Sequence, residues 1–225
     1  WIHLTKGQYN HLNFGTLDAS IRRYAETVAS MDREIGRVLD FLAAHDLAQN
    51  TLVIYTSDNG YLWGEHGLAD KRWAYEEPIR IPFLLRYPAS GHAAGSTLDA
   101  IVANIDVAPT LLDLAGLDVP AHMQGRSLLP LLADRQAERR DALLYSYVFE
   151  PPYPTPTIRA IVTPHHKYIE YDGLPPELFD LAADPREQSN LAGGAAAALE
   201  AELAKRLQTL EVEAEGSGAG QPVAR

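Results

Sequence analysis

Cysteine is absent from the 225-residue chain. Its absence excludes disulfide bonds, zinc–thiolate sites and a thiol nucleophile within these residues. Long apolar runs are missing too: no stretch reaches the roughly 18 residues of a transmembrane helix, so no membrane span is expected. The start of the chain has neither the basic nor the apolar segment of a signal peptide. Because the first residue is Trp1 rather than Met, we expect a fragment or a processed product of a longer protein.

Positive charge is scarce relative to negative charge. The chain has 19 Lys and Arg against 30 Asp and Glu, a net charge of −11. Nucleic-acid binding depends largely on Lys and Arg side chains that neutralise phosphates, so no nucleic-acid partner is expected. An anionic substrate therefore needs a local cationic site. Hydrophobic residues make up 46% of the chain and charged residues 22%, which is ordinary for a globular protein with a sizeable core.

The first regular element is predicted to be a long amphipathic helix that begins at Asp18 or Ser20. Its apolar residues recur at steps of three and four, which places them on one face of a helix: Ile21, Tyr24, Val28, Met31, Ile35, Val38, Leu39 and Leu42. We expect this face to be buried. The stretch before it, residues 1–17, is predicted to be a loop.

Two core strands are predicted next, at residues 51–56 and 82–87, because both are continuous apolar runs. Such runs suit strands that are covered on both faces, as in a parallel sheet. The loop between them, residues 57–80, is long enough to suggest a functional role. A short helix at residues 104–114, closed by Gly116, completes the pattern. The predicted fold class is α/β, with a central, mostly parallel sheet sandwiched by helices.

The character of the chain changes near Ala133, where a charge cluster and a proline-rich segment follow. Beyond them the sequence predicts three short strands and a helix, at residues 158–162, 167–171, 177–180 and about 195–210. We expect an antiparallel sheet with the helix packed on it through Leu199, Leu203 and Leu207.

Three regions follow from these predictions. Residues 1–132 are the C-terminal part of a catalytic α/β domain, residues 133–212 are a small subdomain, and residues 213–225 are a flexible tail.

The segment Ser57-Asp58-Asn59-Gly60 directly follows the first predicted strand. Open α/β sheets bind ligands at the carboxyl ends of their strands. Asp and Asn supply the hard oxygen ligands that Ca²⁺ and Mg²⁺ prefer, and glycine permits a sharp turn. Taken alone, the segment fits an ordinary turn after a strand better than it fits a ligand site.

The residues that follow resemble the sulfatase family. Residues 64–82 (GEHGLADKRWAYEEPIRIP) match that family's GEHG turn, lysine and YEE segment after a strand that ends in SDNG. Residues 104–116 resemble its N-x-D-x-x-P-T-L-L-D-L-A-G helix, and residues 123–128 its following turn. Residues 177–191 (ELFDLAADPREQSNL) resemble its C-terminal signature. The resemblance extends from about Tyr24 to Leu210.

The resemblance implies roles for four residues. Asp58 and Asn59 would be two ligands of an active-site Ca²⁺ or Mg²⁺, and Lys71 would contact the sulfate group. A hard cation and an ammonium group both stabilise charge on ester oxygens as the S–O bond breaks. His66 is a candidate for orienting substrate or acting as an acid, although capping a turn is a simpler role for it.

Other polar residues are interpreted as structural. Asp106 is predicted to cap a helix and Arg126 to anchor a turn. The pair His165-His166 lacks further ligands at a metal-site spacing and is assigned to the surface of a hairpin.

The chain departs from the family in lacking a nucleophile. Sulfatases use a formylglycine made from the Cys or Ser of a C/S-x-P-x-R motif, and no Ser here has Pro two positions later. The paired aspartates that complete the family's metal site are missing too, and neither His3 nor His11 lies in the family's H-x-P context. Formylglycine is therefore expected in an N-terminal part that precedes these residues. Two oxygen ligands make a weak site for Ca²⁺, so the isolated chain is expected to be inactive.

The favoured function is hydrolysis of sulfate esters by the full-length protein, with a sulfated small molecule or glycan as substrate. Tyr61, Trp63 and Trp73 flank the lysine and are candidates for stacking on a sugar, or equally for packing. One alternative is a phosphonate or phosphate ester hydrolase of the same alkaline-phosphatase-like superfamily, although such enzymes commonly have Asp-His where this chain has Asp58-Asn59. Another is a non-catalytic scaffold domain. The resemblance alone favours a periplasmic or secreted location, and the sequence does not indicate an oligomeric state.

Overall fold

The computed structural model describes residues 17–90, 95–134 and 136–216. Residues 1–16 of the loop predicted over 1–17, with His3 and His11, and residues 217–225 of the predicted tail lie outside these ranges. Leu17 belongs to a helix instead of the loop. The chain divides into two compact units, one of residues 1–71 and 77–96 and one of residues 72–76 and 97–225. The boundary predicted after residue 132 falls inside the second unit and stays a prediction.

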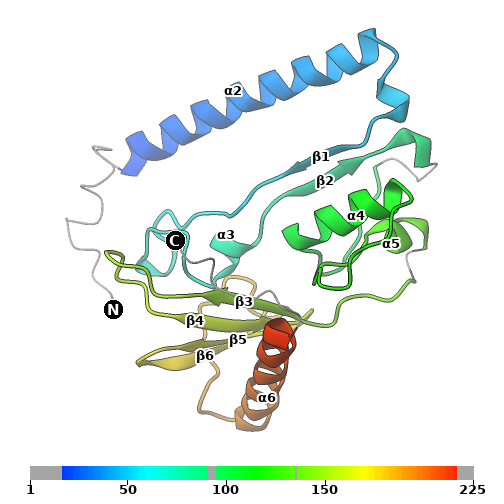
Figure 1. The fold of residues 1–225 in the computed structure, drawn as a ribbon. Helices are drawn as coiled ribbons and strands as arrows, with labels where there is room; N and C mark the ends of the chain where they lie inside the picture. Colours follow the sequence, from blue (N-terminus) through cyan, green and yellow to red (C-terminus); the bar gives the residue numbers. More distant parts are fainter. Residues whose placement is uncertain (1–16, 91–94, 135, 217–225) are drawn as a thin grey trace. The chain divides into compact units, whose positions relative to one another are not determined.

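Within its described residues, the first unit contains one long helix and one strand pair. Helix α2 spans Leu17–Ala44, and strands β1 (Val53–Thr56) and β2 (Phe83–Arg86) follow (Figure 1). β1 and β2 are antiparallel, with Val53 opposite Arg86 and Thr56 opposite Phe83. The mixed α/β fold class is confirmed. The prediction of parallel strands is wrong for the pairing between β1 and β2, which is antiparallel. A run of apolar residues indicates that a strand is buried, but it does not indicate the direction of its neighbour.

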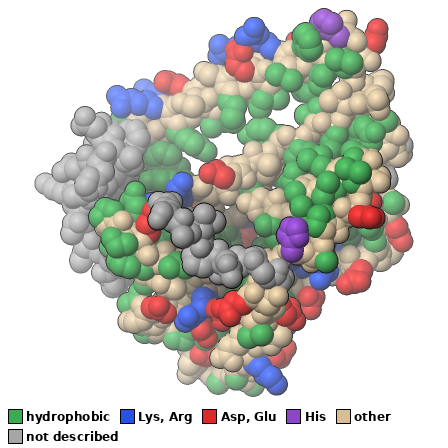
Figure 2. Space-filling view, viewed as in Figure 1, with side chains coloured by type: hydrophobic (Ala, Val, Ile, Leu, Met, Phe, Trp, Pro, Cys, Tyr) green, Lys and Arg blue, Asp and Glu red, His purple; other side chains and the backbone are tan. Residues whose placement is uncertain are grey.

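Helix α2 forms as predicted, but its apolar face is not buried in the described part of the chain. Figure 2 shows hydrophobic side chains in a row along this helix, and Tyr24, Met31 and Val38 are 53%, 41% and 58% exposed. The prediction of a buried face is therefore wrong for the described residues. The spacing of apolar residues determines which side of a helix is hydrophobic, whereas burial also needs a partner, and the described residues leave most of this face uncovered.

The second unit is built around a four-stranded antiparallel sheet of order β3-β4-β5-β6. The strands span Leu143–Tyr147, Ile158–Val162, His166–Tyr171 and Leu174–Asp180. The antiparallel sheet was predicted with three strands, and β3 was missed. Its sequence LLYSY precedes the prolines, and it lies within the segment that was assigned to the domain boundary.

Helix α6 (Ala197–Ala214) covers one face of this sheet (Figure 1). Leu203 and Leu207 are buried against Ile161, Tyr168 and Leu178 of the strands, and Leu199 packs at the margin of the same cluster. The predicted packing of this helix is confirmed. Residues 213 and 214, which were assigned to the tail, still belong to α6.

Shorter elements complete the two units. Helix α4 (Val107–Leu114) ends at Gly116, whose φ of 69° is the left-handed conformation expected of a C-terminal glycine. The others are α3 (Glu76–Ile79), α5 (Leu129–Ala133) and the 3-10 turns η1 (Ala48–Asn50), η2 (Glu65–Gly67), η3 (Pro88–Ser90) and η4 (Asn104–Asp106). None of the described helices is long and apolar enough to span a membrane.

Candidate active site

The turn after β1 holds Asp58 and Asn59 in a local hydrogen-bond network. Asn59 N–H donates to Asp58 Oδ1 at 2.9 Å, and the Ser57 hydroxyl donates to the Asn59 carbonyl oxygen at 2.9 Å. The Asn59 side-chain amide donates to the Gly60 carbonyl oxygen at 2.7 Å. Because the amide nitrogen is engaged in this way, the side-chain oxygen Oδ1 is the atom of Asn59 suited to bind a cation.

The Asp58 carboxylate is exposed and readily ionised. The hydrogen bond from Asn59 N–H is the main cause that lowers the pKa of Asp58, and the positive charge of Lys71 lowers it further. Lys71, itself exposed, therefore lies within the electrostatic reach of Asp58. The backbone of the turn has the larger effect on the pKa of Asp58, and Lys71 adds to it.

Gly60 is required by a close approach of two backbone segments. Its N–H donates to the Pro78 carbonyl oxygen at 2.7 Å, and a Cβ at this position would overlap the carbonyl oxygen of Glu77. A residue larger than glycine cannot occupy the position without moving the backbone. This contact joins the turn of Asp58 and Asn59 to helix α3.

The loop after the turn has its own small core. Leu62 is fully buried, and its N–H donates to the Asp70 carbonyl oxygen at 2.9 Å, which closes the loop just before Lys71. The Trp63 ring contacts the rings of Tyr24 and Tyr61, with centroids 5.2 and 5.0 Å apart. These aromatic side chains pack on one another and remain partly exposed.

His66 lies in the left-handed backbone region, with φ 55° and ψ 17°, inside the 3-10 turn η2. Its Nε2 is 3.4 Å from Glu77 Oε2, and its side chain is only 12% exposed. A non-glycine residue adopts this conformation at some energetic cost, and it stays there only where its surroundings hold it. His66 therefore has a fixed place in the loop, beside the Glu77 carboxylate.

Trp73 is a packing residue, which decides between the two roles left open for it. It is 7% exposed, and its ring lies 5.9 Å from that of Tyr171 on β5, within the second unit. It is not available to stack on a sugar in this structure. Of the three aromatic candidates, Tyr61 and Trp63 keep partly exposed rings.

A buried ionic cluster in the second unit was missed at the level of sequence. Lys167 of β5 is fully buried, with Nζ 2.8 Å from Glu76 Oε1 and 2.7 Å from Glu187 Oε1. Glu187 Oε2 accepts the Glu76 N–H at 2.7 Å. Burial raises the pKa of Glu187, and the Lys167 ammonium opposes this effect. Glu76 belongs to the YEE segment and Glu187 to the C-terminal signature of the resembled family. Lys167 lies in no such motif, and a lysine in a strand is ordinarily exposed.

The C-terminal signature at residues 177–191 folds into a braced loop that holds Glu187. Asp180 Oδ1 accepts the N–H groups of Ala182 and Ala183, and Asn190 Oδ1 accepts the N–H of Leu178. Glu187 itself has φ 52°. Asp180 and Asn190 thus satisfy backbone N–H groups of the signature, and Glu187 binds the buried lysine.

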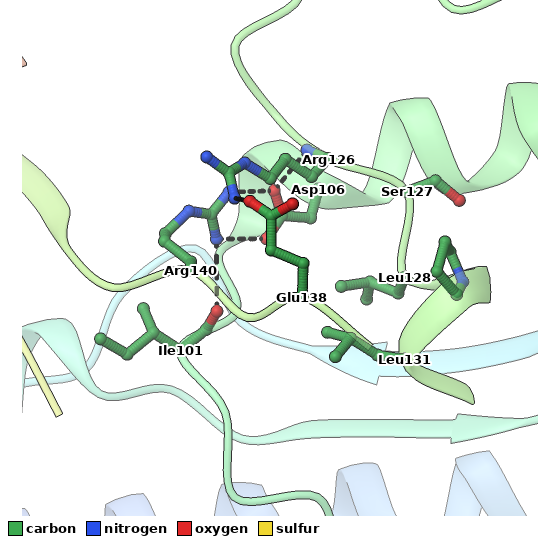
Figure 3. A pocket seen from close by; sticks show the side chains of 9 residues that line it. Ile101, Asp106, Arg126, Ser127, Leu128, Leu131, Glu138 and Arg140 are labelled. Carbon is green, nitrogen blue, oxygen red and sulfur yellow. Dashed lines mark hydrogen bonds and ion pairs between the residues drawn. The ribbon is translucent and has the colours of Figure 1, made fainter. Parts of the chain in front are cut away.

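Asp106 and Arg140 form a second buried pair (Figure 3). The Asp106 carboxylate receives both Arg140 nitrogens, at 2.7 and 2.6 Å, together with the N–H groups of Ala103 and Arg126 at 2.8 Å each. Burial opposes ionisation of Asp106, but these hydrogen bonds prevail and lower its pKa. Asp106 is a structural residue, but the cap role predicted for it is wrong for α4, because its side chain makes no capping hydrogen bond to that helix. Arg126 anchors the turn through its backbone.

His165 and His166 lie at the β4–β5 hairpin, as predicted. His165 is exposed, and His166 exchanges hydrogen bonds with the Thr163 hydroxyl through its backbone groups at 2.9 Å.

The donor set of Asp58 and Asn59 fits part of a site for a hard divalent cation. One carboxylate with a lowered pKa and one carboxamide oxygen are the oxygen ligands that Ca²⁺ or Mg²⁺ takes. Ca²⁺ needs about six to eight ligands, so these two residues hold one side of such an ion. The site is a partial one in the described chain.

The chain is similar to known families and proteins. Residues 64–213 match the family described as N-sulphoglucosamine sulphohydrolase, C-terminal, and residues 5–117 match the sulfatase family. The chain is 42% identical over 197 residues to an N-acetylglucosamine-6-O-sulfatase of Bacteroides thetaiotaomicron, which covers 84% of this chain and 34% of the relative.

Two solved structures share the fold. One, described as in complex with its substrate D-glucosamine-2-N,6-O-disulfate, superposes with a TM-score of 0.83 at 36% identity, over 93% of this chain and 45% of that one. A phosphonate monoester hydrolase of Agrobacterium radiobacter superposes with a TM-score of 0.79 at 29% identity, over 88% of this chain and 42% of that one. This chain therefore belongs to the sulfatase family, of the alkaline-phosphatase-like superfamily. It spans about a third to under a half of the length of the relatives it matches.

Proposed function

We propose that the full-length protein hydrolyses sulfate esters, and that this chain supplies one side of its active site. The observation that supports the proposal most directly is the turn after β1, where the exposed, readily ionised Asp58 lies within the electrostatic reach of Lys71. Asp58 and Asn59 would hold a Ca²⁺ or Mg²⁺ ion, which when bound supplies positive charge to a sulfate oxygen. Lys71 would contact the sulfate group and stabilise the charge that develops on its oxygens.

His66 has a supporting role in the proposal. Its fixed position beside Glu77 suits a residue that orients substrate or donates a proton near neutral pH. The nucleophile, expected to be a formylglycine, and the remaining cation ligands would come from an N-terminal part of the full-length protein. The isolated chain would therefore be inactive.

The substrate would be a sulfated carbohydrate. A relative is named as an N-acetylglucosamine-6-O-sulfatase, and a solved relative holds a disulfated glucosamine. In this chain the partly exposed rings of Tyr61 and Trp63 offer flat apolar surfaces for a sugar ring. A periplasmic or secreted location is proposed because two relatives are named as homologues of an extracellular sulfatase.

A phosphonate or phosphate ester hydrolase is the second candidate, since a phosphonate monoester hydrolase shares the fold. Asn59 favours the sulfatase, because a neutral amide oxygen suits Ca²⁺ or Mg²⁺ while the imidazole common in the other enzymes suits softer metals. The third candidate is a scaffold domain without catalysis. An upstream C/S-x-P-x-R motif would exclude the scaffold, and its absence would support it.

The test compares substrates on one preparation of full-length protein. We expect metal-dependent turnover of an aryl sulfate that exceeds turnover of the matching aryl phosphonate, with loss of activity after treatment with a chelator. In Asn59→His we expect a lower ratio of aryl sulfate turnover to aryl phosphonate turnover. Preferential hydrolysis of the phosphonate by the unchanged protein would favour the second candidate, and no turnover of either ester would favour the scaffold.

A further inference from the structure

The five residues that follow Lys71 form an unusually well-anchored segment. We call Arg72–Glu76 the strap. It belongs to the second unit, although the chain on both sides of it belongs to the first. Trp73, Ala74 and Tyr75 are 7%, 0% and 7% exposed, and they lie in neither a helix nor a strand. Because a segment of this kind has no ladder of backbone hydrogen bonds, other groups must hold it in place.

Two tyrosines of the sheet anchor the strap near Lys71. The Tyr145 hydroxyl of β3 donates to the Arg72 carbonyl oxygen at 2.9 Å. The Tyr75 and Tyr171 hydroxyls both donate to Glu177 Oε2, at 2.8 and 2.7 Å. Burial, and then the negative charge of Glu177, raise the pKa of Tyr75, so its phenol stays protonated as a donor. The bonds of Tyr145 and Tyr75 tie the strap to β3 and β6, and Tyr171 of β5 shares the carboxylate that Tyr75 binds.

The far end of the strap is held by the buried cluster of Lys167, Glu76 and Glu187. Glu187 contacts the strap twice, through the Glu76 N–H and through the lysine that also binds the Glu76 carboxylate. Buried ion pairs add little net stability compared with apolar residues of similar size, because desolvation of the charges offsets their attraction. What they do impose is geometry, since each charge must meet its partner.

We propose that Tyr145, Lys167 and Glu187 are positioning residues for the active site: they fix the backbone of the strap, and thereby the place from which Lys71 reaches the substrate. The proposal rests on the proposed sulfate-binding role of Lys71. Lys71 is joined to Arg72 by a peptide bond, so an anchor at the Arg72 carbonyl limits where the Lys71 backbone can lie. Displacement of a catalytic group by about 1 Å can lower a rate by up to about 10²-fold.

In this proposal the C-terminal sheet and the loop of residues 177–191 have a role at the active site, because they hold the strap. Leu203 and Leu207 build the core of the sheet and helix α6, whereas Glu187 is placed by the loop that follows β6. The leucines stabilise the fold of the sheet and helix α6, whereas Glu187 binds the strap. Substitutions in the two sets should therefore have different consequences.

The test is a double-mutant cycle in the full-length protein. Glu187→Gln keeps the size of the side chain and removes its charge, and Tyr145→Phe removes only the hydroxyl. Each is measured alone and combined with Lys71→Ala. We expect each to lower kcat for an aryl sulfate about tenfold, with KM within about twofold. In the Lys71→Ala background the same changes should lower kcat by less than about twofold, because the group they position is gone.

Two further measurements separate positioning from stability. Leu207→Ala lies in the core away from the strap and serves as the matched control: it should lower Tm without changing kcat well below Tm. Hydrogen exchange of peptides spanning the strap should become faster in Glu187→Gln and stay unchanged in Leu207→Ala. This readout does not depend on turnover, so it distinguishes failure of the present proposal from failure of the proposed function. Equal losses of kcat in both Lys71 backgrounds, or unchanged exchange in the strap, would overturn the positioning role.

Discussion

Removal of the Asp106 carboxylate should unfold the second unit at a much lower denaturant concentration. Asp106 and Arg140 side chains are 1% and 9% exposed, and the carboxylate accepts four hydrogen bonds. Asp106→Ala leaves the buried guanidinium without a partner, which typically costs about 3–5 kcal/mol. The orphaned N–H groups of Ala103 and Arg126 add to that cost only in part, because both residues are partly exposed to water.

The assay is urea unfolding followed by circular dichroism, with the exposed Asp118 as control. We expect Asp118→Ala to change the free energy of unfolding by no more than about 0.5 kcal/mol. The double variant with Asp106→Ala and Arg140→Met should regain part of the loss, because no buried charge is then left unpaired. If Asp106→Ala were neutral, or if the double variant were no more stable than Asp106→Ala alone, the reasoning about the unpaired charge would be refuted.

The same pair predicts a pH dependence. The pKa of Asp106 is lower in the folded state than in the unfolded chain, so the folded protein binds its proton less readily. Its contribution to stability is therefore present above the unfolded pKa of about 3.9 and is lost as the pH falls through the folded value. Between neutral pH and about pH 5 the difference in stability between the native chain and Asp106→Ala should stay constant. Below about pH 4 it should shrink.

Two further substitutions test the core and the turn. Leu207→Ala removes a fully buried side chain and should lower the free energy of unfolding by about 2–5 kcal/mol. Val212→Ala, at a residue that is 69% exposed on the same helix, should change it by less than about 0.5 kcal/mol. Equal effects of the two variants in a denaturant titration would contradict the packing of α6. Gly60→Ala places a Cβ on the Glu77 carbonyl oxygen and should destabilise the first unit by about 1–3 kcal/mol, whereas Gly36→Ala, with open space around it in α2, should stabilise that helix by up to about 1 kcal/mol. Equal thermal shifts in the two glycine variants would contradict the close approach at Gly60.

The parts of the fold that the sequence predicts are those with local causes. The period of the apolar residues predicts α2 and α6, and the left-handed glycine predicts the end of α4 at Gly116. Alternation with turn residues predicts the hairpins of the second sheet. The direction of pairing between β1 and β2 and the exposure of α2 depend on which segments meet in space, and no local pattern contains that information.

The candidate site shows the same division. Asp58, Asn59 and Lys71 could be predicted as candidates because they lie within one continuous motif beside a strand. The buried cluster was missed because Glu76 is separated from Lys167 by 91 residues of chain and from Glu187 by 111, and a charged residue is ordinarily exposed. The sequence pointed to this cluster only through Glu76 and Glu187, which lie in motifs of the resembled family. Those motifs do not indicate which residue the two glutamates bind.

Turnover of an aryl sulfate by the full-length protein and its variants tests the central claim most directly. We predict that Lys71→Ala lowers kcat/KM by about 10²–10³-fold, as expected for loss of one group that stabilises developing charge. Asp58→Ala should lower it further, because it disables the cation site. The exposed residues Lys205 and Asp118 supply the matched controls, and their alanine variants should keep full activity, while the isolated chain should show none. Near-normal turnover by Lys71→Ala, or metal-dependent turnover by the isolated chain, would contradict the assignment of the active site.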